Sequence, residues 1–429
     1  MRHYITRKDC RVSARGSDYF RRGVTFGNPS AAFPPESHIY CGNVFWEMEI
    51  IRKSIGDHIV DEVHGDSIQH LIPLNIRPSS PGFELEEQLE RAWGRLGRTE
   101  SSAWRIVLVN GTGTMLGDSL FGASVAAEIV RRFLDKGLYL RFDILLAINA
   151  AEQSELIWQR TNGVDKIFRG ALSLEKLAGY HAVIDFCQLL KLDGYATEHR
   201  FDFYLNHFGI SPSSVSAFRK RPRIAVQRRA LQEVRAKLEA LRNNVHCRIT
   251  CLQPDASTPV RSMPDDFLSC LVNELLKDSN RYIVGASSML RRLPLHPRII
   301  DCHELTKSSL DHYLALLSVA DEIVSVDTLA LNVACGLDKY ALGFFAQSDH
   351  LILSRYWSKL VPILVPQAQS LAFWHRHKAD NDWPSAEPSY RKAWSDINLE
   401  TVLNHWEVLK ARPIGSVPEP LVLKLPQTS

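Results

Sequence analysis

The sequence lacks the patterns that mark secreted, membrane-spanning and zinc-binding proteins. No apolar run approaches the roughly 18 residues that suggest a membrane helix, and the N-terminal "MRHYITRKDCRVSARGSDYF" has no apolar core of signal-peptide length. The eight cysteines are scattered, and no C-x-x-C pair occurs among them. This usage fits a reduced, cytoplasmic protein with buried free thiols better than a disulfide framework, and its spacing is wrong for a zinc site.

A strong excess of charge of either sign is also absent. The formal net charge is +3 over 429 residues, which argues against a general polyanion binder and thus against nucleic acid as a partner. Hydrophobic residues make up 45% and charged residues 23% of the chain, as in soluble globular proteins. One short basic stretch, "FRKRPR" (218–223), leaves two interpretations open: peripheral contact with the inner face of a membrane, or a solvated linker.

The chain is long enough for two domains and an extension. Residues 1–100 are expected to form an N-terminal extension of modest structure, with an irregular "RRGVTFGNPSAAFPPESH", a strand in "HIVDEVHGD" and a helix over "FELEEQLERAWGRLG". From residue 105, buried strands such as "RIVLVN" alternate with helices. This alternation predicts an α/β fold, in which helices cover a parallel sheet.

The alternation pauses in a segment rich in serine and proline, residues 211–222, and then restarts. The pattern predicts a first Rossmann-like domain over residues 101–215 and a second over residues 216–395. Residues 396–429 are expected to form an amphipathic helix, capped by Asp396 or Asn398, and a proline-rich tail. Ligands of such sheets bind beyond the carboxyl ends of the strands, so the loops at these ends are the candidate sites.

The first candidate loop lies in "IVLVNGTGTMLGDSLFGASVAAEIVRRF" (106–133). Gly111, Gly113 and Gly117 are spaced G-x-G-x-x-x-G, which is not the dinucleotide fingerprint, and no P-loop lysine is present. NAD binding and ATP hydrolysis therefore have weak support. Two interpretations remain: a glycine turn in which Asp118 caps the following helix, or a loop that projects Asp118 into a cleft as a base.

The second candidate loop is "LQPDASTPVRSMPDDF" (252–267). Ser257, Thr258 and Arg261 follow a strand here, and two hydroxyls with a guanidinium suit a diphosphate, because arginine pairs with phosphate through parallel hydrogen bonds. The alternative is an ordinary polar loop in which Asp265 or Asp266 starts the next helix.

The third candidate loop lies in "ADEIVSVDTLALNVACGLDKYALGFFA" (320–346). Asp327 and Thr328 end a strand where a short helix starts, and Asn332 follows one turn later. These side chains are suited to bind ligand hydroxyls or helix amides. The alternative is a simple helix cap, with Asn332 as a satisfied polar residue.

Taken in order, these segments resemble glycosyltransferase family 9, the heptosyltransferase-like enzymes of the GT-B fold. The resemblance spans about residues 105–410 and leaves the N-terminal hundred residues uncovered. Besides the three loops, it rests on "NGVDKIF" (162–168), "HAVIDFC" (181–187) and "EHRFDFYLNHFGI" (198–210). It implies two Rossmann-like domains that face each other across a cleft.

The resemblance implies an inverting glycosyltransferase that moves a sugar from a nucleotide-sugar donor to a hydroxyl of a glycan, lipid, protein or small molecule. By position, Asp118 is the general base, and no metal or further cofactor is needed. The implied acceptor loop contains Gly113, Gly117 and Ser119. The implied donor-binding residues are Ser257, Thr258, Arg261, Asp327, Thr328 and Asn332.

The chain departs from the family pattern mainly at the donor site. In the loop after the first strand of the second domain, Arg261 replaces the family's lysine and Met263 replaces its tryptophan. In the third candidate loop, Leu329 replaces a glycine and Asn332 replaces a histidine. Asp338 and Tyr340 alter the turn that follows. The donor is therefore not assigned as ADP-heptose. Two alternatives are a GT-B-fold nucleotide-sugar epimerase and a non-catalytic binding protein with a degenerate donor site.

Overall fold

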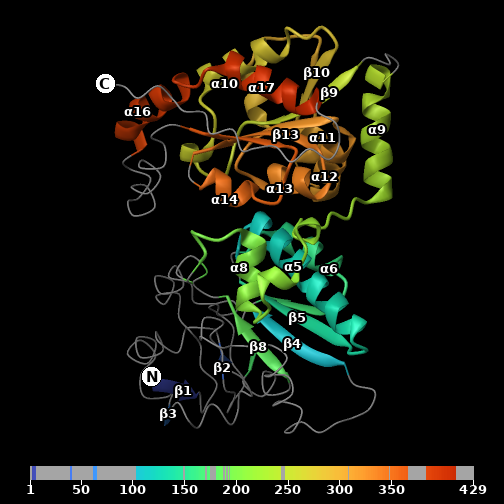
Figure 1. The fold of residues 1–429 in the computed structure, drawn as a ribbon, viewed down its shortest axis with the longest axis vertical. Helices are drawn as coiled ribbons and strands as arrows, with labels where there is room; N and C mark the ends of the chain where they lie inside the picture. The colour runs from blue at the N-terminus through green and yellow to red at the C-terminus, as the bar shows by residue number, and fades with distance from the viewer. Residues whose placement is uncertain are drawn as a thin grey trace. The chain divides into compact units, whose positions relative to one another are not determined.

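The computed structural model divides the chain into two compact units, Met1–Lys220 (unit 1) and Arg221–Ser429 (unit 2). It describes residues 103–411, except 148–149, 170–171, 174–179, 187–188, 190–191, 193, 243–246, 308, 347 and 366–382, and three short strands before residue 103. The division falls inside the segment rich in serine and proline. Each unit is built around a parallel sheet with helices (Figure 1), which confirms the predicted α/β class.

The described parts of the first hundred residues are strands. β1 (Arg2–Ile5) pairs antiparallel with β3 (Asp61–His64), so the strand predicted in "HIVDEVHGD" is confirmed. β2 (Ile39–Tyr40) pairs with β7 (Leu172–Ser173). The predictions of an irregular segment over residues 21–38, a helix over residues 83–97 and a tail after residue 411 lie outside the described residues.

Unit 1 contains a four-stranded parallel sheet in the order β6-β5-β4-β8. Its strands are β4 (Trp104–Val109), β5 (Leu140–Leu146), β6 (Val164–Arg169) and β8 (Ala182–Asp185). Its helices are α5 (Leu116–Asp135), α6 (Glu152–Gln159) and α8 (Arg200–His207). When the four strands are numbered by their order along the chain, they lie in the sheet in the order 3-2-1-4. The apolar residues of β4 are buried on both faces, as expected for a central parallel strand.

Unit 2 contains a six-stranded parallel sheet in the order β11-β10-β9-β12-β13-β14. Its strands are β9 (Arg248–Gln253), β10 (Arg281–Gly285), β11 (Ile299–Asp301), β12 (Glu322–Val326), β13 (Tyr340–Phe345) and β14 (Leu360–Leu364). When these strands are numbered by their order along the chain, they lie in the sheet in the order 3-2-1-4-5-6, which is the order of the Rossmann fold. The strand order reverses between β9 and β12, so a ligand site is expected at the carboxyl ends of these two strands.

Helices cover both faces of the second sheet. They are α9 (Arg228–Arg242), α10 (Asp265–Leu275), α11 (His303–Thr306), α12 (Leu310–Val319), α13 (Leu329–Gly336), α14 (His350–Ser354), α16 (Trp383–Ser395) and α17 (Leu399–Ala411). Within unit 2, α10 and α17 lie on one side of the sheet, and α12 and α13 on the other (Figure 1). The core on the first side includes Phe267, Trp394 and Trp406.

The predicted C-terminal helix is α17, and its cap is Asn398. The Asn398 Oδ1 accepts a hydrogen bond from the Thr401 backbone N–H at 2.9 Å, which satisfies one of the unpaired donors of the first turn. Val402, Trp406 and Leu409 of this helix are buried in the core of unit 2. The predicted helix thus packs into the core of the second unit.

Replacing Asn398 by alanine is expected to lower the free energy of unfolding by about 1 kcal/mol, because the Thr401 N–H loses its acceptor. The loss of stability can be measured by following hydrogen exchange of the α17 backbone amides at increasing urea concentrations. Asn404→Ala is the matched control, because Asn404 is exposed in the middle of the same helix. Equal stabilities for the two variants would show that the cap contributes nothing.

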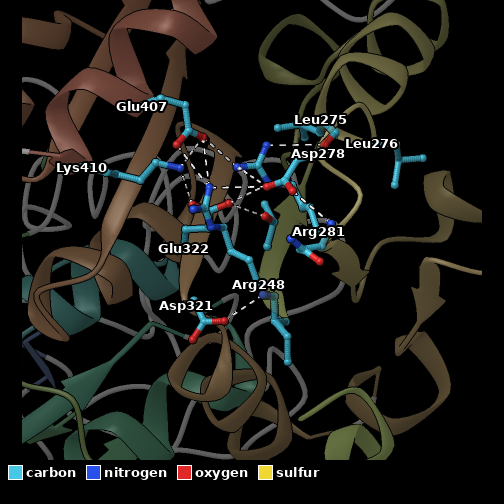
Figure 2. Close-up of polar contacts among 12 residues, drawn as sticks. Arg248, Leu275, Leu276, Asp278, Arg281, Asp321, Glu322, Glu407 and Lys410 are labelled. Carbon is cyan, nitrogen blue, oxygen red and sulfur yellow. Dashed lines mark hydrogen bonds and ion pairs between the residues drawn. The ribbon is translucent and has the colours of Figure 1, made fainter. Parts of the chain in front are cut away.

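A cluster of charged side chains fastens α17 to the amino ends of the strands (Figure 2). Glu322, at the start of β12, lies 3.0 Å from Arg281 Nε and 2.7 Å from Lys410 Nζ of α17. Arg281 also pairs with Glu407 of α17 at 2.8 Å. Burial by itself raises the pKa of Glu407, but hydrogen bonds from Lys410 and Arg281 outweigh it and leave the pKa below its usual value.

The basic stretch "FRKRPR" is engaged in ion pairs. Lys220 Nζ lies 2.7 Å from Asp202 in unit 1, with both side chains buried. In unit 2, Arg221 Nη1 lies 2.7 Å from Asp338. These pairs hold both cations within their own units, so this part of the stretch is not freely solvated. Peripheral contact with a membrane stays a prediction. Within the described ranges, no helix combines the length and the apolar character that crossing a bilayer requires.

Candidate functional site

The first candidate loop leaves β4 and enters α5 at the point where the strand order of the first sheet reverses. Asn110 and Gly111 have φ angles of 67° and 53°, and Gly113 has a φ of 124°. The helix cap is Met115, which makes no side-chain cap hydrogen bond. The prediction that Asp118 caps the helix is therefore wrong, because Asp118 is the third residue of α5. Its carboxylate still lies in the first turn, where the helix dipole favours negative charge.

Gly113 leaves room for this carboxylate. A Cβ atom on Gly113 would lie 3.1 Å from Asp118 Oδ2 and 2.8 Å from Leu189 Cδ2. Both distances are shorter than ordinary van der Waals contact, and the positive φ is itself unfavourable for other residues. Glycine at this position therefore allows the loop to lie close to the Asp118 carboxylate.

Thr112 ties the loop to the first turn of α5. Its hydroxyl donates to the Asp118 carbonyl oxygen at 2.9 Å, and its side chain is fully buried. The Thr112 side chain packs directly against Gly122. A Cβ atom added to Gly122 would lie only 1.9 Å from Thr112 Oγ1. The loop and the helix thus interlock, which fixes the backbone that carries the acid.

Two tyrosines contact the Asp118 carboxylate, and the sequence patterns missed both. The Tyr195 hydroxyl donates to Asp118 Oδ1 at 3.3 Å, and the Tyr204 hydroxyl lies 3.5 Å from the same oxygen. Burial raises the pKa of Tyr204 well above its usual value, and the nearby Asp118 and Tyr195 raise it further. Tyr204 therefore stays protonated, as a donor.

The remaining predicted residues of this loop have different surroundings. Gly117 lies in the first turn of α5 and is half-buried. Ser119 is fully buried, and its hydroxyl donates to Ser154 Oγ of α6 at 3.0 Å. Its side chain thus joins two helices and is closed off from solvent. A contact between the Ser119 hydroxyl and an acceptor stays a prediction.

The second set of predicted residues gathers at the carboxyl ends of β9 and β12. The loop after β9 contains the exposed Ser257 and Thr258, and Arg261 ends a short 3₁₀ helix, η6 (Pro259–Arg261). Asp327 and Thr328 follow β12, which is hydrogen-bonded directly to β9. These residues therefore lie where the strand order of the second sheet reverses.

Arg261 connects the two loops. Its guanidinium donates to Ser257 Oγ at 2.5 Å, to Thr258 Oγ1 at 3.2 Å and to the Asp327 carbonyl oxygen at 3.4 Å. The first two contacts are solvent-exposed. The cation is thus held in place at an accessible edge of the sheet, where it can pair with an anion.

Thr328 is the cap of α13, since its hydroxyl accepts a hydrogen bond from Ala330 N at 3.3 Å. The Asp327 carboxylate instead accepts from Ser348 Oγ at 2.6 Å, a contact that the sequence patterns also missed. Asn332 lies one turn into α13, is half-buried, and has no side-chain hydrogen bond to another described residue. Met263 is buried in the core of unit 2 behind this loop.

The two sets differ in chemistry. The set in unit 1 presents a carboxylate held by phenols, which suits proton abstraction. The set in unit 2 presents a cation, hydroxyls and the amino end of α13, which suit a diphosphate. Across the residues that the structure describes, no cluster of three or more histidine, cysteine or acidic side chains is arranged to hold a metal ion.

Comparisons with known proteins give distant structural likenesses. No protein-family model matches the chain, and no curated protein matches its sequence. A glycosyltransferase family 9 structure from Veillonella parvula has 12% identity and a TM-score of 0.49, covering 72% of this chain and 98% of its own. The ADP-heptose LPS heptosyltransferase II of E. coli has 13% identity and a TM-score of 0.49, covering 71% and 98%. A putative UDP-N-acetylglucosamine 2-epimerase from Listeria monocytogenes has 9% identity and a TM-score of 0.35, covering 75% and 99%.

Proposed function

We propose that the chain is an inverting glycosyltransferase of the GT-B type, which moves a sugar from a nucleotide-diphosphate donor to an acceptor hydroxyl. The observation that carries the proposal is the position of Arg261. It bridges the loops after β9 and β12, where the strand order reverses, beside two hydroxyls and the start of α13. A diphosphate matches such an arrangement in charge and in hydrogen-bonding capacity.

In the proposed reaction, the Asp118 carboxylate removes the proton of the acceptor hydroxyl as its oxygen attacks the anomeric carbon of the donor sugar. The bond from that carbon to the diphosphate oxygen breaks, and the nucleoside diphosphate leaves with the bonding electrons. Arg261, Ser257, Thr258 and the amides at the start of α13 would stabilise the charge on the leaving group. Attack from the face opposite the leaving group inverts the anomeric centre.

Asp327 and Asn332 are proposed to contact the sugar or the ribose hydroxyls of the donor. The Asp327 carboxylate is held by Ser348 at 2.6 Å and lies beside the loop that carries Arg261. Asn332 stands one helical turn after the start of α13. A carboxylate and an amide are suitable hydrogen-bond partners for hydroxyls.

Replacing Arg261 by alanine is expected to weaken the binding of a nucleoside diphosphate about 10- to 100-fold, the effect of losing hydrogen bonds between a cation and an anion. Arg261→Lys is expected to bind with intermediate affinity, because it keeps the charge and loses the planar fork. Titration calorimetry or thermal shift with a panel of nucleoside diphosphates measures the change.

Arg229→Ala is the matched control, because this arginine lies exposed on α9. The absence of binding for any nucleoside diphosphate to the unaltered protein would contradict the proposal. Equal affinities for Arg261→Ala and the control would remove Arg261 from the site. Conversion of a sugar nucleotide without any acceptor would indicate an epimerase, and binding without turnover on any acceptor would indicate a non-catalytic protein.

A further inference from the structure

Tyr195 lies between the quoted motifs 181–187 and 198–210 and has no role in the reaction described so far. It sits in the turn before α8 and is half-buried. Its hydroxyl reaches Asp118 Oδ1, 77 residues away in the chain, at 3.3 Å. The question is whether this contact is a by-product of packing or fixes the carboxylate.

The Tyr195 ring is held in place from two sides. The Arg200 guanidinium carbon lies 3.6 Å from the centre of the ring, within the range of a cation–π contact, and Arg200 also donates a hydrogen bond to the Tyr195 carbonyl oxygen. Phe203 packs edge-on against the ring, with the ring centres 5.4 Å apart. A side chain fixed in this way loses little conformational freedom when its hydroxyl binds a partner.

Tyr204 cannot take over this role. A phenol has a single proton to donate, and the Tyr204 hydroxyl lies 2.7 Å from the Thr112 carbonyl oxygen but 3.5 Å from Asp118 Oδ1. Its proton is therefore committed to the Thr112 carbonyl in the fully buried interior. Of the two phenols, Tyr195 is the one whose proton is directed to the carboxylate.

The two oxygens of the carboxylate lie in different surroundings. Oδ1 faces the phenols, whereas Oδ2 lies on the side of Gly113, 3.1 Å from the place where a Cβ of that residue would be. A hydrogen bond to Oδ1 therefore fixes the rotation of the carboxylate and directs Oδ2 toward the glycine side. Gly113 is buried there, and the place of its Cβ lies 2.8 Å from Leu189 Cδ2, so the missing side chain makes room for the acid itself.

We propose that Tyr195 is a positioning residue for Asp118: its hydroxyl holds Oδ1 and thereby fixes the orientation of the carboxylate that takes the proton of the acceptor hydroxyl. This inference rests on the proposed transferase function. The ionisable groups of the described chain that act in this cluster are Asp118, Tyr195, Tyr204 and Arg200. Arg200 contacts the Tyr195 ring, and its charge lowers the pKa of Tyr204.

Tyr195→Phe tests the proposal, because phenylalanine keeps the ring contacts with Arg200 and Phe203 and removes only the hydroxyl. The turnover kcat is expected to fall about tenfold, the effect of one hydrogen bond to a charged group, while the KM for the donor stays unchanged. The lost donor no longer favours the charged carboxylate, so the acidic limb of the pH profile of kcat/KM moves to higher pH. Tyr139→Phe is the control, because this tyrosine is 67% exposed in the turn between α5 and β5.

A second measurement does not depend on turnover. Carbon-13 titration of the Asp118 carboxyl, identified by its disappearance in Asp118→Asn, is expected to show protonation at higher pH in Tyr195→Phe than in the unaltered protein. Unchanged titration, or reduced turnover with an unmoved acidic limb, would overturn the positioning role. If the unaltered protein transfers no sugar, the proposed function fails, whereas the titration still decides whether Tyr195 acts on Asp118.

Discussion

Asp118→Asn is expected to reduce the rate of sugar transfer about 1000-fold, a loss of about 4 kcal/mol of transition-state stabilisation. Asparagine has nearly the same shape and keeps an oxygen that can accept from the Tyr195 phenol, but its amide cannot take a proton from the acceptor. The affinity for the nucleoside diphosphate is expected to stay the same, because the proposed diphosphate site is built from residues of unit 2. Single-turnover rates with saturating donor measure the effect.

Asp135→Asn is the matched control for this substitution. Asp135 ends the same helix and is 59% exposed, paired with Arg131 at the surface. It is expected to keep full transfer activity. Asp118→Asn with activity equal to that of Asp135→Asn would exclude Asp118 as the general base. A loss of nucleotide affinity together with activity would instead indicate a structural defect.

Glu322→Ala is expected to lower the free energy of unfolding of unit 2 by about 3–5 kcal/mol. The Glu322 side chain is 3% exposed and the Arg281 side chain 5% exposed, so the substitution leaves a buried guanidinium without this carboxylate. It also removes the acceptor of the Thr250 hydroxyl and of Lys410 Nζ. Hydrogen exchange of the amides of β9, β10 and β12 during urea unfolding reports on this unit alone.

Glu233→Ala serves as the comparison, because Glu233 also pairs with two partners but is 42% exposed on α9. Surface pairs of this kind contribute little to stability, because water screens the charges. A similar small loss for Glu322→Ala would mean that water or rearranged side chains satisfy the buried cations. Glu322→Gln separates the contribution of the side chain's shape to stability from that of its charge. Glutamine keeps nearly the same shape and an acceptor for the Thr250 hydroxyl, but it has no negative charge.

The elements of both sheets could be predicted from the sequence because their signals are local. Continuous apolar runs such as "RIVLVN" mark buried parallel strands, and Gly137, which adopts a φ of 75°, marks the end of α5. Asn398 and Thr328 could be recognised as helix caps for the same reason. In each case the residue type and its immediate neighbours carry the information.

Contacts between distant segments could not be predicted in this way. Tyr195 and Tyr204 lie 77 and 86 residues beyond Asp118 in the chain, and no local pattern connects them with it. Ser119 shows a second cause: it directly follows Asp118, but successive helical residues point about 100° apart, so its hydroxyl is buried against α6. Arg281, Glu322 and Lys410 are also far apart in the sequence, and only the folded chain brings their charges together.

The second sheet has its ion cluster and its proposed ligand site at opposite ends of the same strands. Glu322 begins β12 and Asp327 follows it; Arg248 begins β9 and Arg261 lies in the loop beyond it. Substitutions at one end are therefore expected to affect stability independently of substitutions at the other end, because residues more than about 10 Å apart usually act additively on stability. Changes at Leu329 or Asn332, beside the proposed ligand site, are therefore expected to affect ligand binding while the opposite end keeps the unit folded. Such a division separates the residues that hold the unit together from those proposed to bind the ligand.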